Sequence, residues 1–212
     1  MKYKIKSILK SLGFCSSDIA SIYDDIIYVY KLPERGYHGI KHISDMLVNF
    51  DDFMMYSGCS DKINNLYEFA FAILMHDYVN GGKNDIELSI NKSKQFLRRI
   101  SLQYDCRYVE KLIYATDYKK CLNPDFEQGV MQDLDLNIFG SSKEIYDDYS
   151  NKIRIQYKKY PDTIFNPERI KILNKFLNRT YIFNTKYYRD IYEKNARYNL
   201  IREIYKLKSK SI

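Results

Sequence analysis

The three histidines of this 212-residue chain lie in two short stretches, and both stretches could do chemistry. His38 and His42 stand four residues apart in GYHGIKHISDM, so they would share one side of a helix if that stretch is helical. His76 is followed directly by Asp77, at the end of the apolar stretch FAFAILM. A His-Asp pair at the end of a helix that packs inside the protein is costly unless it is hydrogen bonded or coordinates a cation.

Two further carboxylates occur in an apolar setting, in the stretch MQDLDLNIFG. Asp133 and Asp135 alternate there with leucines, so each of them also needs a cationic or hydrogen-bonding partner. Imidazole nitrogens and carboxylate oxygens together suit a divalent transition ion, or Mg²⁺ at the harder end. Four protein ligands leave a six-coordinate ion with open positions, at which a water molecule is activated as a nucleophile near neutral pH. The residue types therefore predict a catalytic type of metal site.

The order of these residues carries a resemblance to a known family. His42, then His76-Asp77, then Asp135 follow the pattern H…HD…D, which resembles the signature of the HD superfamily of metal-dependent phosphohydrolases. The resemblance is closer to a group of small predicted HD phosphohydrolases and runs from about residue 30 to 204. It implies one all-α HD domain over residues 1–212 and a hydrolase that cleaves a phosphate ester of a nucleotide or similar metabolite. The stretches that carry it are LPERGYHGIKHISDML, FAILMHDYVN, DLDLNIFGSSKEIYDDYSNKIRIQYKKY and EKNARYNLIREI.

The first stretch also resembles the metal-site motif of cyclic nucleotide phosphodiesterases, and this assigns expected roles. His42 would be a metal ligand, and His38 would be the general acid that protonates the leaving group. Asp135 is followed by Leu136 and Asn137, which is similar to the D-L-x-N that closes the phosphodiesterase site, so Asp135 is preferred to Asp133 as the last ligand. Asp133 is the fallback or a support for a ligand. The implied ligands of one tightly held divalent ion (Mn, Mg, Co, Fe, Ni or Zn) are His42, His76, Asp77 and Asp135.

Cationic side chains in or near the same stretches are candidates to bind substrate phosphate. They are Arg35, Lys83, Arg154 and Arg197. Arg154 could instead pair with a carboxylate such as Asp147 or Asp148, and Arg197 could pair with Glu193 at helical spacing.

Four acidic or aromatic positions complete the expected site. Glu87 could orient the attacking water or a ligand histidine, and Asp77 could help to take up a proton. Among the many tyrosines, only Tyr37 and Tyr78 adjoin the motif histidines.

The sequence departs from the related group at two places. Gly39 stands where Asn is usual, and ATDYKKC offers Asp117 and Lys119 where that group often has a further histidine. We therefore expect a single metal ion. The alternative interpretation is a catalytically weak HD-fold module that binds a nucleotide or RNA.

The elements that must position these residues are predicted to be helices throughout. Apolar residues recur at helical spacing, no alternating stretch of strand length stands out, and about eight or nine helices are expected. One helix should carry Leu66, Phe69, Ile73 and Leu74 on one face and run on to Gly81-Gly82. Another should begin with Asn166 as its cap and Pro167 at its first position.

Composition limits the class of partner. The net charge of +7 favours anionic partners, and a small phosphorylated substrate comes first. Nucleic acid is possible but not favoured on charge alone, because AT-rich codons would also enrich the chain in Lys, Ile, Tyr and Asn. No apolar run of transmembrane length and no secretory leader are seen, so a cytoplasmic protein without a membrane partner is expected.

Overall fold

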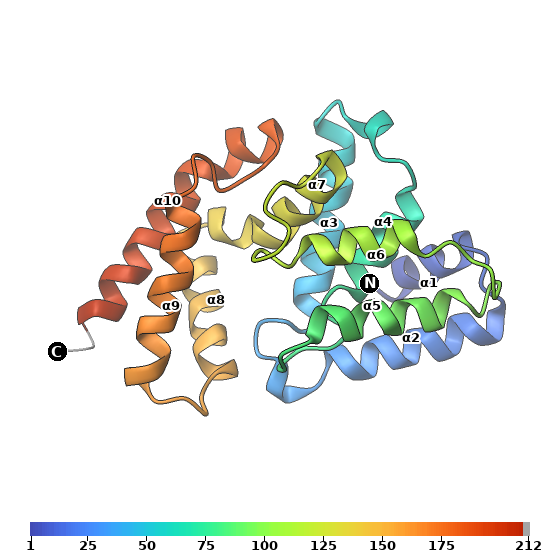
Figure 1. Cartoon of the computed structure of the whole chain (residues 1–212), viewed down its shortest axis with the longest axis horizontal. Coiled ribbons are helices and arrows are strands. Elements are labelled where there is room, and N and C mark those ends of the chain that lie inside the picture. The colour runs from blue at the N-terminus through green and yellow to red at the C-terminus, as the bar shows by residue number, and fades with distance from the viewer. Residues whose placement is uncertain (210–212) are drawn as a thin grey trace. The chain divides into compact units, whose positions relative to one another are not determined.

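The computed structural model describes residues 1–209, and this part of the chain is helical throughout (Figure 1). It contains ten α-helices and three short 3₁₀ helices, and no strand occurs in the described residues. The prediction of an all-α fold is confirmed, with slightly more helices than expected. The chain forms two compact units, Met1–Met131 and Gln132–Ile212, and each is described by itself. Within the described residues no helix is long and apolar enough to cross a membrane.

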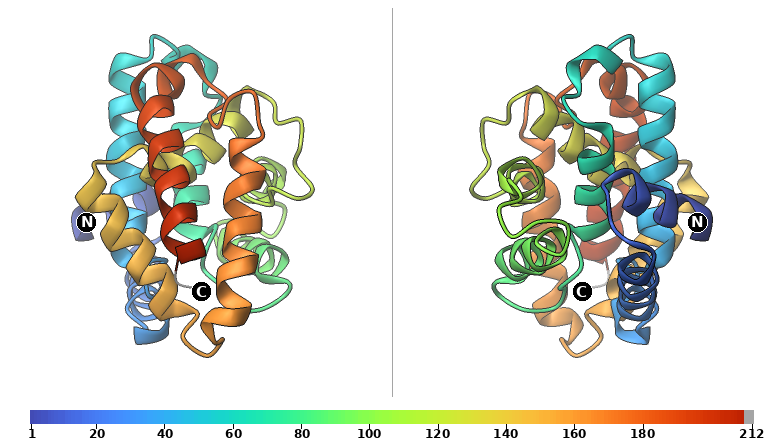
Figure 2. Two further views of the ribbon diagram at one scale, coloured as in Figure 1. Left: turned by 90° about the vertical axis from the view of Figure 1, so that its left-hand side faces the viewer. Right: turned by 90° about the vertical axis from the view of Figure 1, so that its right-hand side faces the viewer.

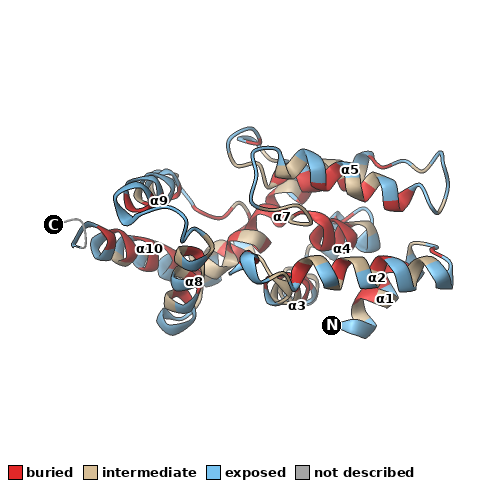
Figure 3. Cartoon of the chain, turned by 90° about the horizontal axis from the view of Figure 1, so that it is seen from below, coloured by how far each residue is buried: buried red, intermediate tan, exposed pale blue. Residues whose placement is uncertain are grey.

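The first unit is built around the helix α4 (Leu66–Met75). Asn65 caps its start, because the side-chain oxygen accepts hydrogen bonds from the main-chain N–H groups of Tyr67 and Glu68. Every residue from Phe69 to Met75 is buried, as Figure 3 shows. A helix that is apolar all round belongs in a core, and α4 contacts α1, α3, α5 and α6. The other helices of this unit are α1 (Lys2–Ser11), α2 (Ser16–Tyr30), η1 (Pro33–Arg35), α3 (Ile40–Tyr56), η2 (Ser60–Lys62), α5 (Asp85–Leu97) and α6 (Arg107–Ala115).

The helix α4 ends six residues before the expected stop at Gly81-Gly82. Its last residue is Met75, and His76 is the C-cap. The main-chain carbonyl groups of Asp77 and Tyr78 accept hydrogen bonds from the Arg35 side chain instead of continuing the helix. His76 and Asp77 are thus presented at the end of a fully buried helix.

The second unit consists of a helical hairpin and a long closing helix. Helix α7 (Phe126–Leu136) begins in the first unit and ends in the second, and η3 (Asn137–Gly140), α8 (Lys143–Gln156), α9 (Asp162–Leu177) and α10 (Lys186–Ser209) follow. Helix α10 lies between α8 and α9 and packs on both (Figure 2). It also crosses η3 so closely that a Cβ atom at Gly140 would stand 2.4 Å from the Cβ atom of Tyr192. Only glycine fits at that crossing.

A buried ion pair joins the three helices of the second unit. The Arg169 guanidinium on α9 donates to the Glu203 carboxylate on α10, with 2.9 Å between Nε and Oε1. From α8, the Tyr146 hydroxyl donates to the same carboxylate, and the Tyr149 hydroxyl accepts from Arg169. A buried charge pair needs such additional bonds to offset its desolvation. These side chains therefore fix how α8, α9 and α10 pack.

The expected start of α9 at Asn166 and Pro167 is wrong. The helix begins at Asp162, after Pro161, and Pro167 lies inside it. The Asp162 carboxylate is favoured in a first helical turn and pairs with Arg154. The main-chain N–H of Phe165 bonds to the Pro161 carbonyl, and the Phe165 side chain is buried. These local contacts outweigh the Asn-Pro capping pattern.

Candidate metal centre

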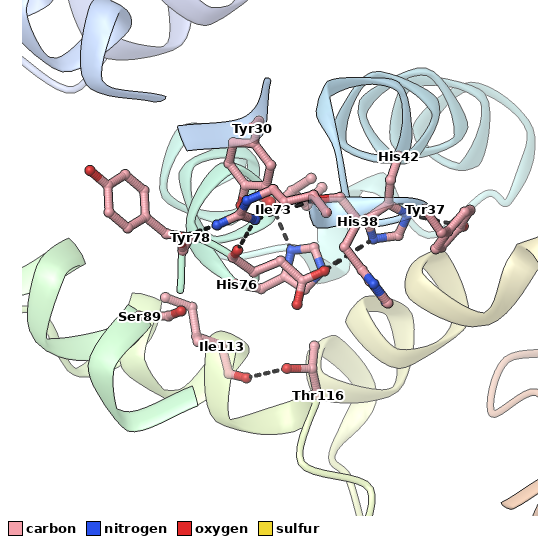
Figure 4. A network of polar contacts seen from close by, with 12 residues as sticks. Tyr30, Tyr37, His38, His42, Ile73, His76, Tyr78, Ser89, Ile113 and Thr116 are labelled. Carbon is pink, nitrogen blue, oxygen red and sulfur yellow. Dashed lines mark hydrogen bonds and ion pairs between the residues drawn. The ribbon is translucent and has the colours of Figure 1, made fainter. Parts of the chain in front are cut away.

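Three ligand-type side chains converge in the first unit, from two segments far apart in sequence. His42 comes from α3 and His76 caps the end of α4 (Figure 4), and Asp77 follows His76 directly in the sequence. The two Nε2 atoms are 3.3 Å apart, and the Asp77 Oδ2 atom is 3.3 Å from His76 Nε2 and 3.7 Å from His42 Nε2. Both imidazoles are 2% exposed. The three predicted ligands of the first unit therefore point their donor atoms at one small volume.

The spacing of these atoms fits a divalent cation. Ligand atoms about 2.0–2.2 Å from an ion are separated from one another by about 3.0 Å at right angles and about 3.5 Å at the tetrahedral angle. The three observed separations lie close to that range. Moreover, the Asp77 Oδ2 atom is buried and accepts no hydrogen bond in the described residues. An unsatisfied carboxylate oxygen facing two imidazole nitrogens is costly by itself and is the kind of site that a cation stabilises.

Each imidazole is oriented through its other ring nitrogen. His76 Nδ1 lies 2.9 Å from the Ile73 carbonyl oxygen, which can only accept, so Nδ1 carries a proton and Nε2 is the ring nitrogen turned toward the cluster. His42 Nδ1 lies 3.0 Å from the Tyr37 hydroxyl. Outer partners of this kind fix the ring of a ligand histidine and its tautomer.

His38 lies beside this cluster without sharing a helical face with His42. Helix α3 begins at Ile40, so His38 belongs to the preceding turn, and the condition under which the two histidines would share a helix face is not met. Its ring centre is 5.8 Å from that of His42 and 5.1 Å from that of Tyr37. The side chain is half-buried. Figure 4 shows it pointing toward the same region as His42 and His76.

The surrounding imidazoles control the charge of Asp77. Burial raises the pKa of this carboxyl group, but His76, His38 and His42 together lower it by more, so its pKa lies well below the usual range. An ionised carboxylate at neutral pH is the form that binds a metal ion.

Arg35 ties the two segments of the centre together. This side chain is 6% exposed, and its guanidinium donates to the main-chain oxygens of Asp77 at 2.6 Å and Tyr78 at 2.5 Å. It also donates to the His38 carbonyl at 3.3 Å and stacks 4.7 Å from the centre of the Tyr30 ring. The turn before α3 is thereby fixed against the end of α4. These bonds give Arg35 a positioning role, and its expected contact with phosphate stays a prediction.

The structure explains why position 39 carries a glycine. A Cβ atom at this position would lie 3.2 Å from the Tyr30 carbonyl oxygen, closer than ordinary van der Waals contact. The glycine that departs from the family pattern therefore fits a close approach of the chain at the start of α3.

The tyrosines next to the motif histidines differ in their contacts. The Tyr37 hydroxyl touches His42, as described above, whereas the Tyr78 ring packs edge-on against Phe96, 5.9 Å between ring centres. Burial raises the pKa of Tyr78, and nearby Asp25 adds to this effect. Tyr78 is thus a packing residue that offers its main-chain oxygen to Arg35.

Two other predicted residues of the first unit lie on exposed segments. Lys83 is in the loop after Asp77, and Glu87 is in the first turn of α5; both are exposed. Their expected roles toward substrate or water stay predictions.

The two arginines of the second unit are engaged by their own unit. Arg197 donates to Glu193 at 2.8 Å and to three main-chain carbonyls at and after the end of α9, which confirms the alternative pairing expected from helical spacing. Arg154 pairs with a carboxylate as well, but with Asp162 at 2.8 Å, not with Asp147 or Asp148. Contact of either arginine with phosphate stays a prediction.

The two candidate carboxylates of the second unit have different surroundings. Asp133 is fully buried and accepts from the main-chain N–H groups of Asn184 at 2.6 Å and Thr185 at 2.7 Å. Burial raises its pKa to about 6, although these hydrogen bonds lower it. Asp135 is half-buried at the last turn of α7. Asp133 thus fixes the segment before α10, and the choice of Asp135 as the last ligand stays a prediction.

Some contributors to the site had no signal in the sequence. The Ile73 carbonyl orients His76, but every residue has a carbonyl group, so nothing marked this one. Asn199, in the stretch EKNARYNLIREI, is buried and donates to the carbonyls of Phe139 and Ser141 at 2.9 Å each. In the second unit this stretch therefore fixes α10 against η3 and the residue that follows it.

Comparisons with protein-family models, with curated proteins and with solved structures found no match for this chain. The resemblance to the HD superfamily therefore stays a prediction from the motif residues.

Proposed function

We propose that this protein is a metal-dependent phosphohydrolase of the HD type, acting on a nucleotide or a similar small phosphorylated metabolite. The observation that carries the proposal is the convergence of His42, His76 and Asp77, with a buried carboxylate oxygen that accepts no hydrogen bond in the described residues. Their order along the chain, with Asp135 further on, supports the same proposal. The expected setting is the cytoplasm.

A divalent ion held by His42, His76 and Asp77, with Asp135 as the expected further ligand, would polarise a phosphate oxygen and lower the pKa of a water molecule. The chain supplies the rest. The tautomer of His76 is fixed by Ile73, and Arg35 holds the main chain of Asp77, so little reorganisation is needed when substrate arrives.

His38 is the chain's best-placed proton donor. Its ring centre lies 5.8 Å from that of His42, it is half-buried and so open to solvent on one side, and imidazole is the side chain best suited to move protons near neutral pH. We assign to it the protonation of the leaving oxygen, a role worth about 10²–10⁴-fold in rate. Phosphate charge would be offset by cations among Lys83, Arg154 and Arg197.

The test is turnover by metal-stripped protein reloaded with Mn²⁺, Co²⁺ or Mg²⁺. Nucleoside monophosphates, triphosphates and cyclic nucleotides are the substrates, and release of phosphate or of the ring-opened product is followed. His42→Ala should lose both bound metal and turnover, whereas His38→Ala should keep the metal and lose about 10²-fold or more in rate.

The matched control is Asp45→Asn, a half-buried carboxylate on the same helix that pairs with Lys41. It should leave both metal and turnover unchanged. Turnover by His42→Ala equal to that of the wild type, or absence of metal-dependent turnover across all the substrates, would contradict the proposal.

A further inference from the structure

The basic character of the chain is confined to its second unit. Residues 1–131 contain 17 Lys and Arg and 17 Asp and Glu, whereas residues 132–212 contain 17 and 10. The whole net charge of +7 therefore falls in the second unit. A codon bias would enrich both units in lysine alike, so it does not account for this division.

The acidic residues of the second unit are mostly engaged, which leaves lysines unmatched. Asp147, Asp148, Asp162, Asp190, Glu193 and Glu203 all pair with a Lys or Arg of the same unit. Among the described residues, lysines of this unit that have no carboxylate within 4.0 Å are Lys158, Lys159, Lys175, Lys194, Lys206 and Lys208. A unit with this surplus of positive charge attracts a polyanion.

Two of these lysines stand in a turn that is built to a fixed shape. The α8–α9 connection reads Tyr157-Lys158-Lys159-Tyr160-Pro161 and lies at the lower end of both helices in Figure 1. From α8, the Arg154 guanidinium donates to the carbonyls of Tyr157 at 3.1 Å and Tyr160 at 3.0 Å. It also pairs with Asp162 and so spans the whole turn. Arg154 thus stiffens the turn.

The turn presents aromatic rings between cations. The rings of Tyr157 and Tyr160 are stacked, with their centres 6.4 Å apart and their planes at 30°, and these residues are 40% and 41% exposed. Lys158 and Lys159 are exposed, and the Lys159 ammonium lies 5.2 Å from the centre of the Tyr160 ring. A half-exposed aromatic face can stack on a nucleic-acid base while neighbouring ammonium groups contact the phosphates. A duplex hides the faces of its bases, so the arrangement favours a single strand.

We propose that the Tyr157–Tyr160 turn of the second unit binds single-stranded nucleic acid. The shared chemistry is a phosphate backbone with unstacked bases, and RNA and DNA both offer it. This binding goes beyond the phosphohydrolase proposal and needs none of the metal-centre residues.

The test is fluorescence anisotropy of labelled oligonucleotides of about 15 nucleotides with the full-length protein, a length that spans a typical binding site. Single-stranded RNA, single-stranded DNA and a duplex of the same sequence are compared at about 50 and about 200 mM salt. The wild type should bind a single strand more tightly than the duplex. The ratio of its affinities for single-stranded RNA and DNA shows which sugar it prefers.

Charge and stacking are tested by separate variants. The double variant Lys158→Gln with Lys159→Gln should lose two phosphate contacts. Each contact contributes about 0.7 to the slope of log affinity against log salt concentration, so the slope should become shallower by about 1.4. Tyr160→Ala should weaken binding about fivefold or more, whereas Tyr160→Phe, which keeps the ring, should bind as the wild type does.

The matched control removes the same two positive charges from the first unit, whose net charge is zero. Lys119→Gln with Lys120→Gln alters two exposed lysines that also follow a tyrosine, and it should leave binding unchanged. His76→Ala should also bind the strand normally, which separates this proposal from the phosphohydrolase. An equal loss in the Lys119 and Lys120 control, equal affinity for the duplex, or binding to anionic vesicles without binding to any oligonucleotide would overturn it.

Discussion

Replacing Arg35 by lysine tests whether a main-chain clamp builds the metal centre. The guanidinium makes two short bonds, to the carbonyls of Asp77 and Tyr78, and a longer one to His38. Lysine keeps the positive charge, but its single ammonium group cannot bond two carbonyls in the fixed fork of a guanidinium. Arg35→Lys should therefore release one of the two segments that carry the ligands.

The expected size follows from the lost bonds. A hydrogen bond from a charged group contributes about 1.5–3 kcal/mol, and lysine can replace about one of the two short bonds. We expect the free energy of unfolding to fall by about 1.5–3 kcal/mol. Loss of a residue that orients ligands commonly weakens metal binding by about 10–100-fold, and we expect a change of that order.

The assay combines urea unfolding of the metal-stripped protein with calorimetric titration of Mn²⁺. Arg99→Lys is the matched control: Arg99 also lies over an aromatic ring, 5.2 Å from Phe96, and its ion pair with Asp18 is exposed. That substitution should cost less than about 1 kcal/mol and leave metal affinity unchanged. Mn²⁺ affinity of Arg35→Lys equal to the wild type, with a higher KM for substrate, would refute the clamp and favour the phosphate contact instead.

Two further outcomes are expected. Tyr37→Phe removes the hydroxyl that touches His42 Nδ1 and should weaken Mn²⁺ binding about tenfold or more without unfolding the protein, and an unchanged titration would contradict this. Burial raises the pKa of Asp133 from 3.8 to about 6, so the folded protein binds a proton at this carboxyl group more tightly than the unfolded chain does. The resulting contribution to stability is complete below about pH 4 and is lost as the pH rises through about 6. The difference in unfolding free energy between the wild type and Asp133→Asn should therefore fall by about 3 kcal/mol over that interval, and a difference independent of pH would contradict the assignment.

The helices could be predicted because their signal is local. Apolar residues from Phe69 onward predicted that α4 packs inside the protein, and at its end His76 is buried while Asp77 is half-buried. Helix ends were less predictable. The chain leaves α4 at Met75 because Arg35, about 40 residues earlier, binds the carbonyls that follow, and α9 starts at Asp162 because of Arg154. Such tertiary contacts leave no trace in a short window of sequence.

The candidate centre was predictable only in part. Residue types indicated a metal site, but the pairing of His42 with His76 and Asp77 came from the order of motifs, since their separation in sequence gives no geometric information. The main-chain partners of the site, such as the Ile73 carbonyl, could not be predicted, because main-chain acceptors are the same at every position. The use of Arg35 as a positioning residue was missed for the same reason.

The most direct test of the central claim is the binding of a divalent ion to the metal-stripped wild type and to Asp77→Asn, measured by Mn²⁺ titration and by the change in Tm. Asparagine keeps the size of the side chain but removes the charge that faces the two imidazoles. The account predicts tight binding by the wild type with a raised Tm, loss of both in Asp77→Asn, and no change in the Asp45→Asn control. Equal binding by Asp77→Asn and the wild type would contradict a metal centre at His42, His76 and Asp77.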